Sequence, residues 1–168
     1  RGLLYAGLMI TKGGPKVVEF NVRFGDPEAQ VVIPRLKTDL VDLIEATIDG
    51  TLDQVELEWD PRPAMCVVMA SGGYPGSYEK GKPISMPDDL GVGVIVFHAG
   101  TKIQDGTLVT SGGRVLAVTA LAPTFSAAAE ASRAAAAQID FDGAFFRSDI
   151  GWRERRRIDR DSQEEEEA

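Results

Sequence analysis

The sequence predicts an α+β fold, and three observations support this prediction. Short apolar runs, some of them alternating with polar residues, occur along most of the chain, which is typical of β-strands. Only two stretches have the pattern of a longer helix. Apolar residues recur at helical spacing in residues 39–48, and alanine is abundant in residues 126–139. Glycine-rich turns separate the apolar runs of the second half. They favour an antiparallel, sandwich or barrel-like domain with one packed helix.

Composition narrows the classes of function. The chain has 168 residues, of which 43% are hydrophobic, so it suits one domain or two small ones with a real core. The net charge of −8 argues against a nucleic-acid partner, and the absence of a long apolar run argues against a membrane partner. The single Cys66 lies in an apolar run, which predicts a buried, inert thiol and a reducing, cytoplasmic location.

The first third of the chain is expected to contain a hairpin and two helices. Residues 4–10 and 16–23 are predicted as strands joined by a Gly-Gly turn. Asp26-Pro27 predicts the start of a short helix, because Asp caps free amides and Pro suits the first helical position. A second helix is predicted over residues 39–48, and Gly50 is expected to end it.

Two prolines between Trp59 and Ala64 predict a domain boundary near residue 60. Residues 61–152 then form the β-rich domain, with strands over 64–70, 92–98 and 115–121 and the single helix over 126–139. Residues 153–168 carry five basic and seven acidic side chains and are predicted to be a solvated, disordered tail. The chain begins without Met inside a patterned segment, so we expect it to be a piece of a longer protein.

Three polar side chains share one face of the second strand. Glu19, Asn21 and Arg23 are two residues apart, so they point away from the apolar row that is expected to pack on the core. The simplest interpretation is an ordinary amphipathic surface strand. A sharper one is a phosphoryl-transfer row, because carboxylate and amide oxygens bind Mg²⁺ and an Arg fork binds phosphate.

These residues carry a family resemblance. Glu19-Phe20-Asn21-Val22-Arg23 resembles the Glu-x-Asn-x-Arg strand of ATP-grasp ligases, and the continuation to Gln30 resembles the phosphoribosylamine–glycine ligase family. Further segments resemble the C-terminal part of that family in the same order, so the resemblance extends from residue 1 to about 152. These segments are Tyr5–Met9, Lys37–Leu40, Gly72–Gly76, Phe97–Thr101, Gly112–Leu116 and Asp149–Trp152.

The resemblance implies a fold and a reaction. Residues 1–60 would be the C-terminal part of an ATP-grasp domain, and residues 61–152 the family's C-terminal domain. ATP would phosphorylate glycine, and the amine of 5-phosphoribosylamine would attack the resulting glycyl phosphate. Glu19 and Asn21 would be ligands of Mg²⁺ or Mn²⁺, and Arg23 would be the catalytic residue that neutralises the transferred phosphoryl group.

Substrate-binding residues are expected in two places. Gly25 and Asp26 precede the predicted short helix, whose free amides attract an anion, although Asp26 also suits orienting a substrate amine or capping the helix. In the second half, the loop with Gly73, Tyr74 and Pro75 is expected to bind the ribose phosphate, with a simple turn as the alternative. Arg114 is expected either to bind that phosphate or to be a surface side chain. His98 is expected to be structural, and the two tyrosines of the loop can equally serve packing.

The expected partners are ATP, glycine, 5-phosphoribosylamine and the N-terminal part of the same enzyme. The chain has no nucleotide-clamping lysine segment or Gly-rich phosphate loop, so we expect it to be inactive alone. Two alternatives remain. One is a fragment of another ATP-grasp carboxylase or ligase, against which Gly25-Asp26-Pro27-Glu28 argues. The other is a non-catalytic β-rich binding module.

Overall fold

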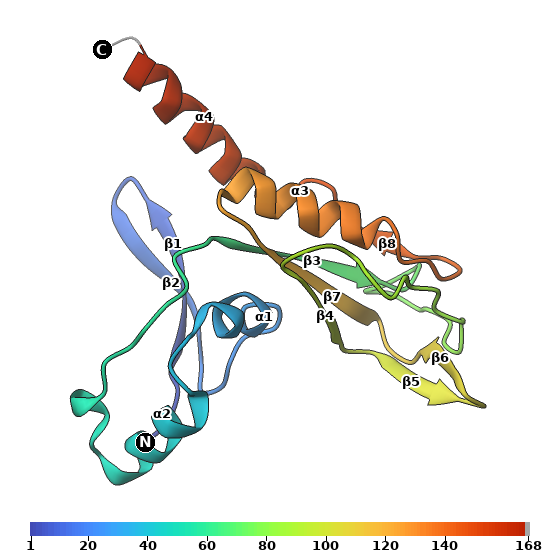
Figure 1. Cartoon of the computed structure of the whole chain (residues 1–168), viewed down its shortest axis with the longest axis horizontal. Helices are drawn as coiled ribbons and strands as arrows, with labels where there is room; N and C mark the ends of the chain where they lie inside the picture. The colour runs from blue at the N-terminus through green and yellow to red at the C-terminus, as the bar shows by residue number, and fades with distance from the viewer. Residues whose placement is uncertain (167–168) are drawn as a thin grey trace. The chain divides into compact units, whose positions relative to one another are not determined.

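The computed structural model describes residues 1–166, and residues 167–168 lie outside the description (Figure 1). The described residues divide into two compact units, one from Arg1 to Pro61 and a second that begins at Arg62. Each unit has its own secondary structure, and each is described by itself. The change of unit falls within the proline-containing segment between Trp59 and Ala64.

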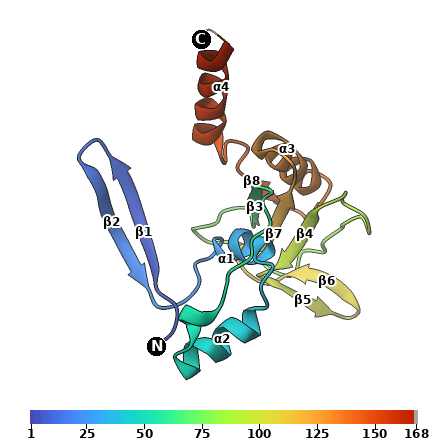
Figure 2. The same cartoon turned by 60° about the vertical axis from the view of Figure 1, so that its left-hand side comes forward.

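A β-hairpin opens the first unit. Strand β1, Tyr5–Thr11, pairs antiparallel with β2, Gly14–Asn21, and Figure 2 shows the two as a long twisted ribbon. The register places Tyr5 opposite Asn21 and Gly7 opposite Glu19, with an irregularity after Gly7. The predicted hairpin is therefore present, although β2 ends two residues before Arg23.

The apolar row of the hairpin is not buried, which is a correction to the sequence analysis. Val18, Phe20 and Val22 keep 66%, 61% and 85% of their surface exposed. The pleat does alternate apolar and polar side chains in β2, but no described element of the first unit covers the apolar face. Leu8, Met9 and Ile10 of β1 are exposed as well.

The predicted start of the first helix is wrong. Helix α1 spans only Ala29–Val32 and continues as the 3-10 turn η1, Ile33–Arg35. Glu28, and not Asp26, occupies its N-cap position, and the Asp26 carboxylate accepts a hydrogen bond from the Gln30 side chain at 2.8 Å. The Gly25 carbonyl accepts instead from the Ala29 amide at 2.9 Å.

The second helix follows the prediction closely. Helix α2 spans Leu40–Asp49, and the Asp39 carboxylate caps it by accepting from the Val41 amide at 2.7 Å. Gly50 ends it with a φ of 79°, a left-handed conformation that suits a residue without Cβ. A 3-10 turn, η2, follows at Leu52–Gln54.

The second unit is built on an antiparallel sheet with the strand order β4-β7-β3-β8. Its strands are β3 at Ala64–Ala70, β4 at Val94–His98, β7 at Arg114–Leu121 and β8 at Phe145–Phe146. A separate ribbon pairs β5, Thr101–Gln104, with β6, Thr107–Thr110, around the Asp105-Gly106 turn. The α+β prediction is confirmed, while the ribbon and β8 are additions to it.

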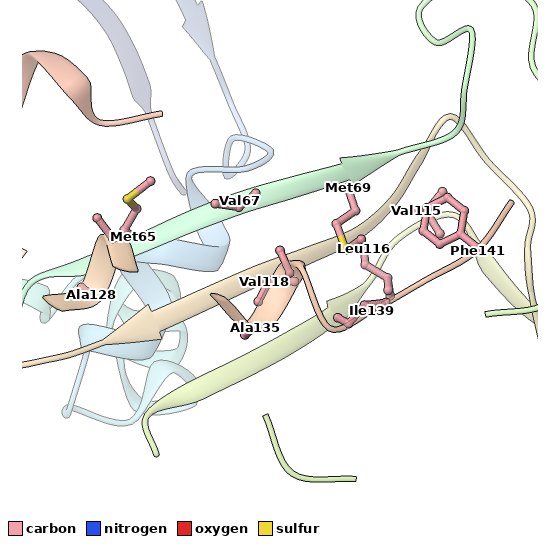
Figure 3. Packing of buried hydrophobic residues seen from close by; sticks show 12 residues of the cluster. Met65, Val67, Met69, Val115, Leu116, Val118, Ala128, Ala135, Ile139 and Phe141 are labelled. Atoms are coloured by element: carbon pink, nitrogen blue, oxygen red, sulfur yellow. The ribbon is translucent and has the colours of Figure 1, made fainter. Parts of the chain in front are cut away.

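Helix α3, Phe125–Ala136, packs on β3 and β7 and forms the core with them (Figure 3). Its buried residues are mainly alanines, which let the helix approach the sheet closely. Met69, Leu116 and Val118 supply the volume from the sheet side, and all three are fully buried. Cys66 of β3 is also buried, as the sequence predicts.

Within the segment 153–168 that the sequence predicts as a disordered tail, residues 153–166 belong to a helix, and residues 167–168 lie outside the described residues. Helix α4 spans Trp152–Glu166. Its charges alternate at helical spacing, and Arg157 contacts both Glu154 and Asp161, three residues before it and four after it, at 2.7 and 2.6 Å. Such pairs stabilise an isolated helix, although each contributes only about 0.2–0.5 kcal/mol. Among the described helices, none is long and apolar enough to cross a membrane.

Candidate functional site

The first candidate site lies at the end of β2. Glu19 and Asn21 point to the same side of the strand, and the Asn21 amide nitrogen donates to Glu19 Oε1 at 3.1 Å. Glu19 is exposed and Asn21 is half-buried, so both oxygens are accessible to a ligand. Gly7 lies opposite Glu19, and a Cβ there would be 3.1 Å from Glu19 Cγ, so the missing side chain leaves room for the carboxylate.

Arg23 differs from the predicted row of three. It lies beyond the last residue of β2, and its guanidinium donates to the backbone carbonyl of Phe24 at 2.9 Å. Strand alternation therefore places Glu19 and Asn21 together but does not by itself place Arg23 with them.

Two residues without a predicted role, Tyr5 and Glu28, link the hairpin to the segment after it. The Tyr5 hydroxyl donates to Glu28 Oε1 at 3.1 Å, and this hydrogen bond to the carboxylate raises the pKa of Tyr5. Gly25 is buried beneath Glu28, because a Cβ there would be 2.3 Å from Glu28 Oε2. The four-residue α1 is too short to supply the helix dipole on which the predicted anion site at Gly25 and Asp26 depended.

The second candidate site lies at one end of the sheet in the second unit. The loop after β3 and the loop before β7 are joined by Ser71, whose amide donates to Gly113 O at 2.8 Å and whose hydroxyl donates to Gly112 O at 2.9 Å. The register of β3 and β7 shifts between Met69 and Ala70, opposite the start of β7 at Arg114. Such irregularities change the direction in which nearby side chains point.

This arrangement brings two predicted residues into contact. Arg114 Nε donates to the Tyr74 hydroxyl at 3.2 Å, across 40 residues of sequence. The Tyr74 ring meets the edge of the Tyr78 ring at a centroid distance of 6.2 Å, and Lys80 Nζ lies 5.9 Å from the centre of the Tyr78 ring. Two cationic side chains thus flank a pair of tyrosines.

Gly113 is fixed as a glycine by this packing. A Cβ on Gly113 would lie 2.2 Å from Tyr74 Cδ2 and 3.0 Å from Tyr78 Cε1, well inside van der Waals contact. The space that a side chain would need is therefore filled by the tyrosine that contacts Arg114. His98, which the sequence analysis expects to be structural, bonds with the Thr101 hydroxyl at 3.0 Å.

A charged cluster that the sequence analysis does not single out lies nearby in the chain. Lys82 Nζ is 2.7 Å from Glu79 Oε2 and 2.8 Å from Asp142 Oδ2. The hydrogen bond and charge of Asp142, followed by those of Glu79, raise the pKa of Lys82, and Lys82 in turn lowers the pKa of Asp142. The cluster borders an open cavity of about 150 Å³ that Ser71, Gly72 and Gly143 also line. Lys82 and Asp142 are 60 residues apart in the sequence, so no local pattern predicts this pair, whereas Glu79 is only three residues before Lys82.

Comparison with known proteins identifies the family. Residues 64–153 match the family described as Phosphoribosylglycinamide synthetase, C domain, and residues 1–29 match the ATP-grasp (A) domain of the same synthetase. The chain belongs to this phosphoribosylglycinamide synthetase family. The resemblance seen in the sequence is thereby confirmed, and the chain corresponds to the C-terminal portion of the family.

Relatives in this synthetase family match about nine tenths of the chain. A phosphoribosylamine–glycine ligase of Vibrio parahaemolyticus is 55% identical over 154 residues, which are 90% of this chain and 36% of that protein. One of Brucella melitensis is 52% identical over 154 residues, with the same coverage. The chain thus spans about a third of the length of the curated relatives it matches.

Solved structures agree with the family assignment. The crystal structure of phosphoribosylamine–glycine ligase from Thermotoga maritima matches with a TM-score of 0.75 and 36% identity, over 87% of this chain and 36% of that one. The biotin carboxylase domain of a Hydrogenobacter thermophilus 2-oxoglutarate carboxylase matches with a TM-score of 0.55 at 17% identity, over 84% of this chain and 32% of that one. The second likeness concerns the fold alone.

Proposed function

We propose that the chain is part of an enzyme that joins glycine to 5-phosphoribosylamine with hydrolysis of ATP to ADP and phosphate, a step of purine synthesis. The observation that carries the proposal is the adjacent Glu19 and Asn21 pair, on a hairpin within the segment that matches the synthetase ATP-grasp domain. ATP transfers its terminal phosphoryl group to the glycine carboxylate. The substrate amine then attacks the glycyl carbon, phosphate leaves, and glycinamide ribonucleotide is formed.

The donor set at the end of β2 fits a hard divalent cation. Glu19 offers carboxylate oxygens and Asn21 an amide oxygen, and Mg²⁺ prefers oxygen ligands while keeping other positions for water and phosphates. The present hydrogen bond between the two side chains would give way when the amide oxygen turns to a metal. Bound Mg²⁺ or Mn²⁺ would neutralise the charge of the ATP phosphates. Among residues 1–166, no cluster of three or more acidic, His or Cys side chains offers a competing site.

The other residues receive roles that match their chemistry. Arg23 would neutralise the transferred phosphoryl group once its guanidinium leaves the Phe24 carbonyl. Gly25 would contact the glycine, and Asp26 would orient a substrate amine rather than an anion, because α1 is too short for a helix dipole. The Gly73-Tyr74-Pro75 loop and Arg114 would hold the phosphate of 5-phosphoribosylamine, which the contact between Tyr74 and Arg114 supports.

We also propose the domain assignment and the partner that the sequence suggests. Residues 1–60 would complete the ATP-grasp domain and residues 61–152 would form the C-terminal domain, in the cytoplasm. The N-terminal part of the enzyme would supply the nucleotide-clamping residues and cover the apolar face of the hairpin, where Phe20 and Val22 are exposed. The chain alone should therefore give no sustained phosphate release with ATP, glycine, 5-phosphoribosylamine and Mg²⁺.

The decisive experiment is Glu19→Gln in the complete enzyme that carries this chain. The variant should lose most of its turnover and require more Mg²⁺, while its thermal unfolding stays unchanged because the side chain is exposed. Glu45→Gln on the exposed face of α2 is the matched control and should behave as the unchanged enzyme. Near-native activity of Glu19→Gln at limiting Mg²⁺ would show that the metal assignment is wrong. Stimulation of ATP hydrolysis by bicarbonate rather than glycine would indicate a carboxylase instead.

A further inference from the structure

The contact between Arg114 and Tyr74 has a consequence for the second candidate site. Arginine binds phosphate well when its planar fork is held in one orientation, because less conformational entropy is lost on binding. The Tyr74 hydroxyl accepts from Nε, which belongs to the side of the guanidinium and not to its tip. A hydrogen bond at Nε restricts the plane of the guanidinium group. The side-chain torsions of Arg114 then set the direction of its two terminal nitrogens.

The surroundings hold Tyr74 in place for this contact. Its ring lies against Gly113, where a Cβ would be only 2.2 Å from Cδ2, and its other neighbour is the edge of Tyr78. Its amide donates to Ser71 O at 3.0 Å, so the backbone of the loop is anchored to the end of β3. Tyr74 is half-buried, as expected for a side chain held by packing on the ring and by a hydrogen bond at the hydroxyl.

We propose that Tyr74 is a positioning residue that orients the guanidinium of Arg114 for a phosphomonoester, and that it does not itself bind the substrate. This inference rests on the proposed function, in which Arg114 holds the phosphate of 5-phosphoribosylamine. It revises the role of Tyr74 from substrate-binding to support of the residue that binds. Gly113 belongs to the same device, because only glycine lets the ring approach Arg114 from that side.

The test uses Tyr74→Phe in the complete enzyme, since this change keeps the ring and removes only the hydroxyl. The dissociation constant for the stable product glycinamide ribonucleotide and the KM for 5-phosphoribosylamine should both rise about two- to tenfold, because the unsupported guanidinium must be ordered when the phosphate binds. The kcat and the KM values for ATP and glycine should not change. Tyr78→Phe removes the same hydroxyl from the neighbouring ring and should change each constant less than twofold.

A double-mutant cycle with Arg114→Ala separates this inference from the proposed function. Arg114→Ala should weaken product binding more than Tyr74→Phe does, and adding Tyr74→Phe to it should have no further effect. If Arg114→Ala leaves product binding unchanged, the phosphate role in the proposed function fails. If Arg114→Ala weakens binding but Tyr74→Phe does not, only the positioning role fails. An equal effect of Tyr74→Phe in both backgrounds would show direct substrate contact and overturn the inference.

Discussion

Replacement of Gly113 by alanine tests the packing of the second unit most directly. The added Cβ would lie 2.2 and 2.7 Å from two carbons of the Tyr74 ring and 3.0 Å from Tyr78, so Tyr74 must move or the start of β7 must shift. Gly113 is buried, and its backbone carbonyl is held by the Ser71 amide at 2.8 Å, which restricts the second route. Overpacking of this kind costs about 1–3 kcal/mol of unfolding free energy.

Thermal unfolding followed by circular dichroism measures this loss. A domain of roughly 100 residues loses about 4–8 °C of Tm for each kcal/mol, so a cost of about 1–3 kcal/mol should lower the Tm of the second unit by roughly 4–24 °C in Gly113→Ala. Gly13→Ala is the control, because the nearest atom to its Cβ, Thr11 Oγ1, is 3.9 Å away. The control should change the free energy of unfolding by less than about 1 kcal/mol.

The same substitution in a Tyr74→Ala background decides whether the ring is the cause. Without the ring, the nearest remaining atom to the new Cβ is Tyr78 Cε1 at 3.0 Å, so most of the cost should disappear. An equal Tm decrease with and without the ring would refute the steric argument, because it would place the cost in the backbone at Gly113.

Three further predictions concern stability. Lys82 lowers the pKa of Asp142, so their pairing contributes to stability above the ordinary Asp pKa of about 4 and is lost as the pH falls through the lower folded value. Asp142→Asn should therefore lower the Tm at pH 6, and the difference should shrink as the pH falls below the ordinary Asp pKa, whereas a difference that stays constant with pH would exclude the pair. Ser132→Ala should lower the free energy of unfolding, measured in urea, by about 1–2 kcal/mol, because the fully buried hydroxyl donates to Val118 O at 3.0 Å. An unchanged free energy of unfolding would contradict a stabilising role of this hydrogen bond. Asp39→Ala should cost about 1 kcal/mol through loss of the α2 cap and Asp39→Asn much less, so equal losses would contradict the capping role.

Local sequence patterns predict the elements whose cause is local. Helix α2 has its apolar spacing and its terminal Gly50 within a dozen residues, and the structure reproduces both and adds Asp39 as the cap. Strand β3 coincides with its apolar run. A strand that is buried on both faces is apolar along its length, so the sequence indicates it without knowledge of its partner strands. The short α1 shows the limit: Asp26 has the residue type of a cap, but the helix begins only at Ala29, with Glu28 at its N-cap position.

The candidate sites divide in the same way. Alternation along β2 correctly places Glu19 beside Asn21, whereas Arg23 lies past the strand end, where alternation no longer applies. The contact of Tyr74 with Arg114 forms because the sheet brings two loops together. The spacing of the two residues in the sequence does not predict this contact. The sequence pattern does not predict helix α4, because a run of mixed charges also suits a solvated tail. In the structure, Arg157 forms ion pairs with residues three before it and four after it, which is the spacing of a helix.

The exposed hairpin has a thermodynamic consequence for how the chain opens. A two-stranded ribbon that buries little apolar surface is only marginally stable in water. Amide hydrogens shared by β1 and β2 should therefore exchange with solvent through cheap local openings, whereas those between β3 and β7 should exchange only on unfolding of the second unit. The strand that carries Glu19 would thus be poorly protected until other residues cover Phe20 and Val22, and the Glu19 and Asn21 pair proposed to bind a metal would become ordered together with that cover.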